Sequence, residues 1–214
     1  MMPSCIAFID LETTGLDPVK HEILQIGIVR VDARTLTIHS QIELKVIPVR
    51  IIDAEAKALE VNGYREELWI DAVPLRDALM TIRPWLKGAV LAGHNPSFDA
   101  SFLAEGYRSE GVSAPGMDYH KLDTASLAWP LWRTGAIGAL SLGPVCKHLG
   151  IDRPTPHGAL ADARASLEVA RQLMIPETAL ETRVDEVIFA WRKFGLTPIL
   201  GASLADLDKA RRGS

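Results

Sequence analysis

Carboxylates and one histidine fall into three short clusters along the chain. Asp10 and Glu12 come directly after an apolar run, Asp99 stands near the start of a predicted helix, and Asp162 follows His157 by five residues. Grouped carboxylate oxygens are the ligands that Mg²⁺ and Mn²⁺ prefer, and a nearby imidazole can accept a proton from water. These residue types suit metal-assisted hydrolysis, provided that the fold brings the clusters together.

The first cluster closes a predicted strand, Cys5–Ile9, whose residues are all apolar. Side chains alternate along a strand, so Asp10 and Glu12 face the same way with their Cα atoms about 6.6 Å apart. Gly15 then allows a tight turn. An exposed strand end beside a capped turn would explain the pair equally well.

The second and third clusters lie at predicted helix starts. Ser97 is predicted to cap a helix and to place Asp99 in its first turn, where acidic residues are common. Asp162 is expected in the second turn of a later helix, and His157 in the loop before it can swing over the same site. Each feature alone has an ordinary structural explanation, but strand ends and helix starts of this kind converge at one edge of a central sheet.

The order and spacing of these clusters resemble the DEDDh, or DnaQ-like, 3′–5′ exonucleases of the ribonuclease H-like fold. That family carries Asp-x-Glu-Thr/x-Thr-Gly, Asn-x-x-Phe-Asp and His-x-Ala-x-x-Asp-Ala signatures in this order. The chain matches them with Asp10-Leu11-Glu12-Thr13-Thr14-Gly15, Asn95-Pro96-Ser97-Phe98-Asp99 and His157-Gly158-Ala159-Leu160-Ala161-Asp162-Ala163. The resemblance covers roughly residues 6 to 174, and three ordered motifs are far more specific than one.

The resemblance implies a role for each matched residue. Asp10, Glu12, Asp99 and Asp162 become the metal-holding carboxylates, and His157 becomes the general base. Two Mg²⁺ or Mn²⁺ ions, about 3.5–4 Å apart, would activate water and hold the leaving 3′-oxygen. The substrate-binding candidates are Thr13, Thr14, Leu16, Asn62, Asn95 and Phe98.

These substrate candidates rest on different arguments. Leu16 and Phe98 can wedge or stack against the terminal base, and core packing explains each of them equally well. Backbone N–H groups near Thr13 and Thr14 are candidates to meet the 3′-hydroxyl or the phosphate. Asn62 lies in a Val-Asn-Gly segment that resembles a family segment near the terminal nucleotide.

Some features depart from the family pattern. Gly158 stands where many relatives have an arginine, segment 54–58 does not align cleanly, and the tail beyond Pro176 has no family counterpart. Asp123 fits a recurring acidic position that is not catalytic. Because no motif supplies a lysine or arginine, we expect the four carboxylates to converge without a fixed cation among them.

The apolar runs predict an α/β protein with the three-layer ribonuclease H-like fold, in which helices flank a mixed central sheet. Predicted strands are Cys5–Ile9, Ile26–Val31, Ile42–Ile47, Ala89–Ala92 and Met117–Leu122. Predicted helices are Ile52–Val61, Leu75–Leu86, Ser97–Glu110, one from Thr124, Ser141–Leu149 and one over 159–174. Residues 1–175 form the expected exonuclease domain, and 176–214 a C-terminal helical extension of unknown role that includes Thr178–Phe194.

A net charge of −4 over 214 residues, with no basic stripe, excludes a protein that coats nucleic acid. It suits an enzyme that holds a short single-stranded 3′ end of DNA or RNA and balances the charge with bound cations.

Cys5 and Cys146 match no zinc or redox spacing. The N-terminus resembles no signal peptide and no segment could span a membrane, so we expect a cytosolic protein.

Two other interpretations stay open. A haloacid-dehalogenase-type phosphatase shares a loose Asp-x-Glu-x-Thr likeness at residues 10–14, but that class needs a second aspartate in place of the glutamate. A catalytically silent nucleic-acid or polymerase-binding module can keep the same fold, although it would be expected to lose part of the carboxylate set. The sequence also leaves open DNA or RNA as substrate, and a polymerase or a second copy of the chain as partner.

Overall fold

The computed structural model describes residues 3–153 and 157–174, and every described helix and strand belongs to the first of two units, Met1–Leu173. The predicted helix Thr178–Phe194 and the rest of the extension lie outside the described residues. The domain boundary at residue 175 therefore stays a prediction. None of the described helices is both long and apolar enough to cross a membrane.

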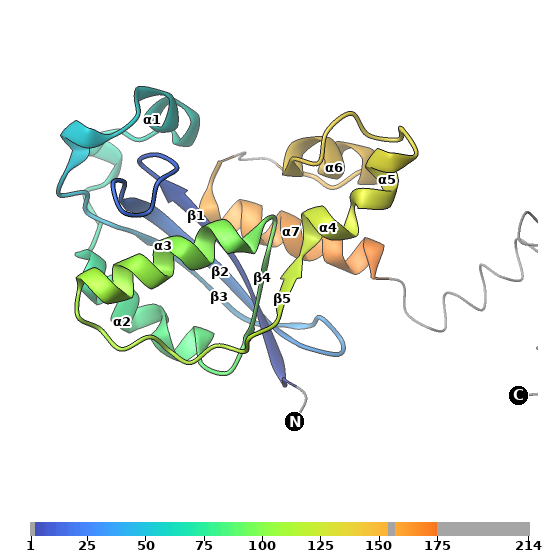
Figure 1. Cartoon of the computed structure of the whole chain (residues 1–214), viewed down its shortest axis with the longest axis horizontal. Helices are drawn as coiled ribbons and strands as arrows, with labels where there is room; N and C mark the ends of the chain where they lie inside the picture. The colour runs from blue at the N-terminus through green and yellow to red at the C-terminus, as the bar shows by residue number, and fades with distance from the viewer. Residues whose placement is uncertain (1–2, 154–156, 175–214) are drawn as a thin grey trace, which may run out of the picture. The chain divides into compact units, whose positions relative to one another are not determined.

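A five-stranded mixed sheet forms the centre of this unit (Figure 1). Its strands are β1 (Cys5–Thr13), β2 (Ile23–Asp32), β3 (Ile38–Lys45), β4 (Val90–Gly93) and β5 (Lys121–Asp123). They lie in the order β3-β2-β1-β4-β5, with antiparallel pairing among the first three and parallel pairing of β4 with β1 and β5. The predicted mixed sheet is confirmed.

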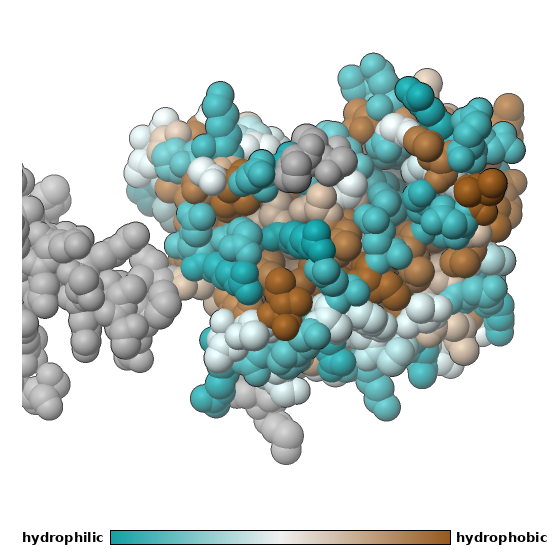
Figure 2. All heavy atoms as spheres, turned by 180° about the vertical axis from the view of Figure 1, so that it is seen from behind, coloured by the Kyte–Doolittle hydropathy of each residue, from teal (hydrophilic) through white to brown (hydrophobic). Residues whose placement is uncertain are grey.

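Helices cover both faces of the sheet, which confirms the predicted three layers (Figure 1). They are α1 (Ala56–Asn62), α2 (Leu75–Leu86), α3 (Pro96–Ser109), α4 (Thr124–Leu127), α5 (Trp129–Arg133), α6 (Leu142–Leu149) and α7 (Ala159–Leu173). α2 and α3 pack on one face, and α7 lies along the other with α4 and α6 against it. Viewed from behind, the surface mixes hydrophilic side chains with smaller hydrophobic areas (Figure 2).

Several elements begin or end elsewhere than the apolar pattern predicts. The first strand continues through Asp10 and Glu12, because β2 pairs with it along its whole length. The predicted helix Ile52–Val61 begins later, after a short 3₁₀ turn. The predicted strand Met117–Leu122 is confined to Lys121–Asp123. The remaining predicted elements within the described residues agree with the structure apart from shifts at their ends.

The cap of α3 differs from the prediction. Ser97 lies inside the helix, and Asn95 precedes it in a left-handed conformation with a φ of 67°. Pro96 takes the first helical position, because its fixed φ suits that place and its missing N–H would have no partner there. The cap assigned to Ser97 is therefore wrong, although Asp99 still falls in the first turn of α3.

The alternation of side chains along β1 directs the acidic pair to one face of the sheet. Ile9 and Leu11 pack in the cluster with α2 and α3, whereas Phe8 packs in the cluster with α7. Asp10 and Glu12 continue the series of Phe8, so both side chains point to the α7 side. The strand thus carries its carboxylates toward the helix that bears Asp162.

Gly27 in β2 allows α7 to approach the sheet beside Asp10, its partner across the ladder. A Cβ built on Gly27 would lie 2.2 Å from backbone atoms of Ala159 and Leu160. No side chain fits at that distance, so glycine is required where the start of α7 crosses β2. The close approach brings Asp162, in the first turn of α7, to the strand that carries Asp10.

We expect Gly27→Ala to displace the start of α7 and to lower the melting temperature. The added methyl group would meet backbone that cannot retreat unless the helix moves, and such overpacking typically costs about 1–3 kcal/mol. Thermal unfolding followed by circular dichroism measures the effect. Gly138→Ala is the matched control, because nothing lies within 4 Å of its added Cβ. Equal melting temperatures for the two variants would contradict the expectation.

Candidate active site

The two carboxylates of β1 lie near the C-terminal end of the strand. Asp10 and Glu12 are both partly exposed. Neither carboxylate accepts a hydrogen bond from another described residue. Both groups therefore keep their oxygen lone pairs available for a ligand.

Polar side chains of the sheet hold the start of α7 in place beside them. Gln25 Oε1 accepts a hydrogen bond from the Ala159 N–H at 3.2 Å. Glu43 Oε1 accepts one from the Leu160 N–H at 3.3 Å. The first N–H groups of a helix have no partner within it, so these acceptors fix its N-terminus. Asp162, buried at 4% exposure, is held at the cluster by this arrangement.

Asp99 reaches the cluster from the other face of the sheet. β4 pairs with β1 only over Ile6–Phe8, so the edge of β1 on the β4 side is open beyond that point. There Asp99 Oδ1 accepts a hydrogen bond from the Leu11 N–H at 2.9 Å. The divergence of the two parallel strands thus makes room for a carboxylate from α3.

The pKa values of these acids reflect their convergence. Burial raises the pKa of Asp10 well above its usual range, and the charges of Asp99, Glu12 and Asp162 raise it further. Burial, followed by the charge of Asp162, raises the pKa of Glu12 to about 7. Burial also raises the pKa of Asp99 to about 7, against the lowering effect of its backbone hydrogen bonds. The carboxylates therefore repel one another at neutral pH, as expected of a site built for cations.

His157 lies with Glu12 and Asp162 around one point. One imidazole nitrogen and one oxygen from each carboxylate lie within 4.8 Å of one another. His157 is exposed in the turn before α7, as predicted, and has a φ of 64° in the left-handed region. The imidazole thus approaches the carboxylates from the solvent side.

The expectation that no fixed cation lies among the carboxylates is wrong. Arg153 Nε donates to Asp162 Oδ1 at 2.6 Å, and a terminal guanidinium nitrogen donates to Oδ2. The charge of Arg153 also partly offsets the rise in pKa of Asp10 and Glu12. Arg153 belongs to none of the motifs, and only the path of the chain between α6 and α7 brings it to the site.

Three predicted substrate residues surround the turn after β1, and their polar groups are engaged in the fold. Thr13 Oγ1 donates to the Gly15 carbonyl at 2.8 Å. The Thr14 N–H donates to the Glu22 carbonyl at 2.9 Å, so this amide is not free for a phosphate. Asn62 Nδ2 donates to the Thr13 carbonyl at 3.0 Å and ties α1 to the turn.

The other three predicted substrate residues differ in exposure. Leu16 exposes 75% of its surface, which rules out core packing. Phe98 is partly buried and packs against Phe102, with ring centroids 4.9 Å apart. Asn95 is exposed, and its N–H donates to Asp123 Oδ1 at 2.9 Å. Leu16 is therefore available to a ligand, whereas Phe98 also serves the core.

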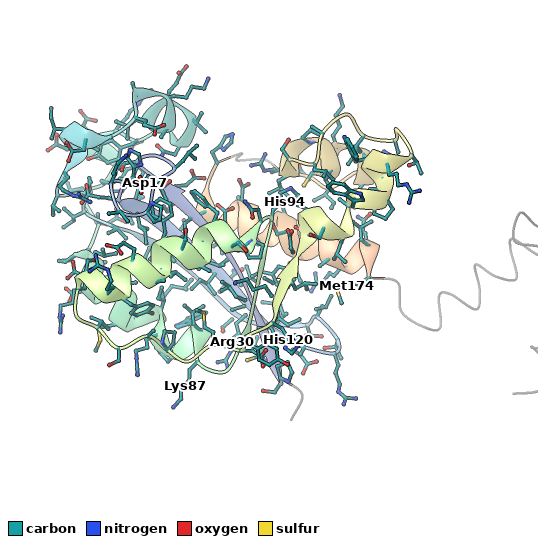
Figure 3. The ribbon with its side chains drawn as sticks, in the orientation of Figure 1. Asp17, Arg30, Lys87, His94, His120 and Met174 are labelled. Carbon is teal, nitrogen blue, oxygen red and sulfur yellow. The ribbon has the colours of Figure 1, made fainter. Side chains whose placement is uncertain are left out.

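His94, labelled in Figure 3, follows β4 and links it to the start of α4 and to the segment before α6. The motifs did not indicate this role. Its ring is hydrogen-bonded to Thr124 Oγ1 at 2.9 Å and to the Leu140 carbonyl at 2.5 Å. Burial lowers the pKa of His94. Asp123 caps α4 and accepts the bond from Asn95, so it holds helix starts together.

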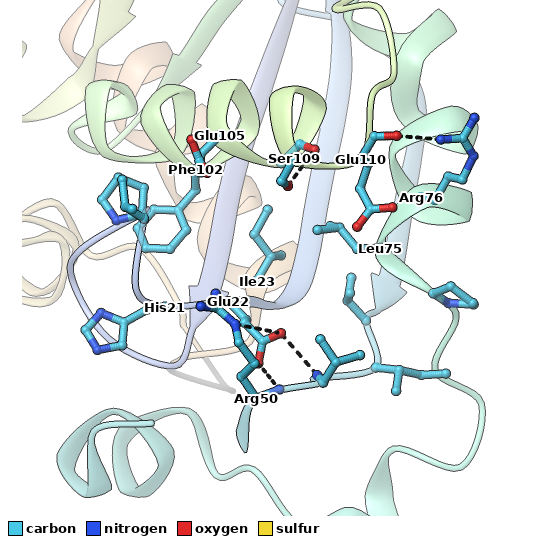
Figure 4. Close-up of a pocket in the computed structure, with 17 residues that line it drawn as sticks. His21, Glu22, Ile23, Arg50, Leu75, Arg76, Phe102, Glu105, Ser109 and Glu110 are labelled. Atoms are coloured by element: carbon cyan, nitrogen blue, oxygen red, sulfur yellow. Dashed lines mark hydrogen bonds and ion pairs between the residues drawn. The ribbon is translucent and has the colours of Figure 1, made fainter. Parts of the chain in front are cut away.

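A cavity of about 460 Å³ lies between α3, the loop after β1 and segment 46–50 (Figure 4). None of the four carboxylates lines it. Glu22 at its wall is already held by the N–H groups of Val49 and Arg50, at 3.1 and 2.7 Å. The cavity is therefore distinct from the carboxylate cluster, which is the candidate active site.

Comparison with known proteins gives one family for most of this chain. The RNase_T family, described as Exonuclease, matches residues 7–170. DNA polymerase III subunit epsilon of Salmonella typhimurium is 32% identical over an alignment of 169 residues that covers 75% of this chain and 68% of that protein. The PolC-type DNA polymerase III of Thermotoga maritima is 30% identical over 163 residues. The chain spans only 11% of that polymerase's length.

Solved structures show the same fold. Escherichia coli exonuclease I in complex with a dT13 oligonucleotide aligns with a TM-score of 0.71 and 18% identity, over 88% of this chain and 44% of that one. The nuclease domain of 3′hExo, a DEDDh family member bound to rAMP, aligns with a TM-score of 0.65 and 18% identity, over 80% of this chain and 92% of that one. The predicted ribonuclease H-like fold is confirmed.

We expect the melting temperature in chelator to fall as the pH rises from about 5 to about 8. The unfolded chain releases the protons of these acids at ordinary acidic pH, whereas folded Glu12 and Asp99 keep theirs up to about pH 7. In this window the folded state binds more protons, so raising the pH favours unfolding; below it the stabilisation is fully present. Asp10→Asn removes one repelling charge and should flatten the fall, with melting at or above the wild-type temperature.

Asp53→Asn serves as the control, because it removes a charge from an exposed residue of the 3₁₀ turn. Its pH dependence should match that of the wild type. Melting of Asp10→Asn well below the wild type in chelator would instead mark Asp10 as a hydrogen-bonded structural acid.

Proposed function

The chain belongs to the RNase_T exonuclease family, and from this membership and its carboxylate cluster we propose that it removes nucleoside 5′-monophosphates from the 3′ end of a nucleic acid strand. One observation carries the proposal. Four carboxylates from β1, α3 and α7 converge, with the pKa of three raised by burial, and His157 stands beside them. The family match also excludes the phosphatase alternative, and the complete set of five residues argues against a silent module.

The donor set fits divalent cations. Members of the family use divalent metals, and one solved form of Escherichia coli exonuclease I holds a zinc ion. In this chain every acidic donor is an oxygen, which favours Mg²⁺ or Mn²⁺ over a closed zinc site. We propose Asp10, Glu12, Asp99 and Asp162 as the ligands of two ions. When bound, such a pair activates water and stabilises the leaving 3′-oxygen.

His157 supplies the proton transfer in this proposal. Its ring lies within 4.8 Å of carboxylate oxygens of Glu12 and Asp162 but is exposed, so it can face a water molecule from the solvent side. A neutral imidazole accepts a proton from the attacking water, whereas the carboxylates hold the cations.

Leu16 and Phe98 are proposed to hold the terminal nucleotide. Leu16 projects from the turn that ends β1 and is largely exposed, and Phe98 stands one residue before Asp99. Apolar contacts and stacking suit any base, because every base has a π-face. The proposed substrate is therefore a single-stranded 3′ end of DNA or RNA. The epsilon relative is a polymerase III subunit, which supports a polymerase as a further partner.

We expect 5′-labelled single-stranded DNA or RNA to give a ladder of products that shorten by one nucleotide from the 3′ end. The reaction should require Mg²⁺ or Mn²⁺, because the uncompensated carboxylates would otherwise repel the phosphodiester. Denaturing gels of single strands and duplex, with metal and with chelator, show the pattern. Asp10→Asn is the inactive control. Internal cuts, full activity in chelator, or release of the 5′ label at the first step would each refute the proposal.

His157→Ala should lose most of the rate while metal binding persists, because His157 is assigned as base and not as ligand. Removal of a general base typically costs about 10²–10⁴-fold in rate. Single-turnover kinetics and a Mn²⁺ titration measure the two properties separately. His39→Ala, at an exposed position of β3, is the matched control. Near-normal turnover of His157→Ala at neutral pH would move the role to another group.

A further inference from the structure

Arg153 lies outside the family motifs. Its hydrogen bonds to Asp162 fix the position of its side chain. It extends from the segment after α6 to α7. Its guanidinium passes close to Gly143, where an added Cβ would lie 3.7 Å from Nη1 of Arg153. Only 15% of the Arg153 side chain is exposed, and 6% of that of Asp162. Both oxygens of Asp162 accept hydrogen bonds from the same guanidinium. Such a two-pronged pair is among the stronger charged contacts in proteins.

The partner of Arg153 is one of the four proposed metal ligands. A carboxylate engaged through both oxygens by a guanidinium has less negative charge to offer a second cation. The charge of Arg153 also lowers the pKa of Asp10 and of Glu12. One fixed positive charge therefore already offsets part of the negative charge of Asp10, Glu12 and Asp162.

Resting on the proposed function, we propose that Arg153 is a tethered counter-ion that competes with divalent metal for Asp162. It stabilises the carboxylate cluster in the metal-free protein, and metal binding at Asp162 weakens the hydrogen bonds between Arg153 and that carboxylate. Arginine keeps its charge at all physiological pH values, so Arg153 remains a cation throughout that range. Arg153 acts through Asp162 and is a positioning residue.

Two measurements on the full chain should move in opposite directions in Arg153→Gln. In chelator the variant should melt below the wild type, because Asp162 and its neighbours lose their cation. Free Mn²⁺, followed by electron paramagnetic resonance without nucleic acid, should show binding at least about tenfold tighter than the wild type, which equals about 1.4 kcal/mol. A merely structural contact would weaken both properties together.

Two further variants separate charge from general damage. Arg153→Lys keeps the positive charge, so its Mn²⁺ affinity should stay within a few-fold of the wild type. Arg133→Gln removes the same charge from an exposed position of α5 and should bind Mn²⁺ as the wild type does. Unchanged or weaker Mn²⁺ binding by folded Arg153→Gln overturns the inference.

The wild-type protein offers a test that does not depend on the folding of a variant. The Nε–H signal of Arg153, assigned by its loss in the spectrum of Arg153→Lys, should shift when Mg²⁺ is added, because its bond to Asp162 Oδ1 changes. A signal that stays in place while Mg²⁺ binds overturns the inference alone. If the wild type binds neither Mn²⁺ nor Mg²⁺, the proposed metal site fails as well.

Discussion

Four carboxylates cannot be gathered at neutral pH unless the rest of the fold opposes their repulsion. The carboxylates of Asp10 and Glu12 accept no hydrogen bond from another described residue, whereas Asp99 is held by the Leu11 N–H and Asp162 by Arg153. The opposing free energy comes from burial elsewhere, since apolar side chains of β1 pack on both faces of the sheet. The site is thus an unfavourable arrangement maintained by a favourable core, as is common at functional sites.

Two features of the sheet decide where this arrangement forms. Gly27 permits α7 to cross β2 in close contact, and this places Asp162 beside the strand that carries Asp10. The early end of β4 leaves the Leu11 N–H for Asp99. One carboxylate therefore arrives from each helical layer and two from the strand between them. The carboxylate cluster depends on this meeting of layers near the end of a central strand.

Arg153 adds a fixed positive charge that partly balances the negative charges of the site. Arg153 relieves part of the repulsion among the acids. The metal ions proposed for this site would neutralise the rest. A counter-ion on the protein chain makes the metal-free state less costly and metal binding less favourable. In this way a residue outside every motif influences the balance between the two states.

The sequence by itself determined which residues are candidates for the site and in which order they occur along the chain. The runs and spacing of apolar residues are local properties of the sequence, which is why the mixed sheet and most helices could be predicted. The candidate acids follow from the resemblance of three ordered motifs to those of the DEDDh exonucleases. Other features depended on contacts between distant segments. The bond of Arg153 to Asp162, the need for glycine at residue 27 and the engagement of Thr14 with Glu22 arise from packing that no local pattern encodes. Ser97 shows the same limit at short range, because the steric preference of Pro96 for the first helical position moved the cap to Asn95.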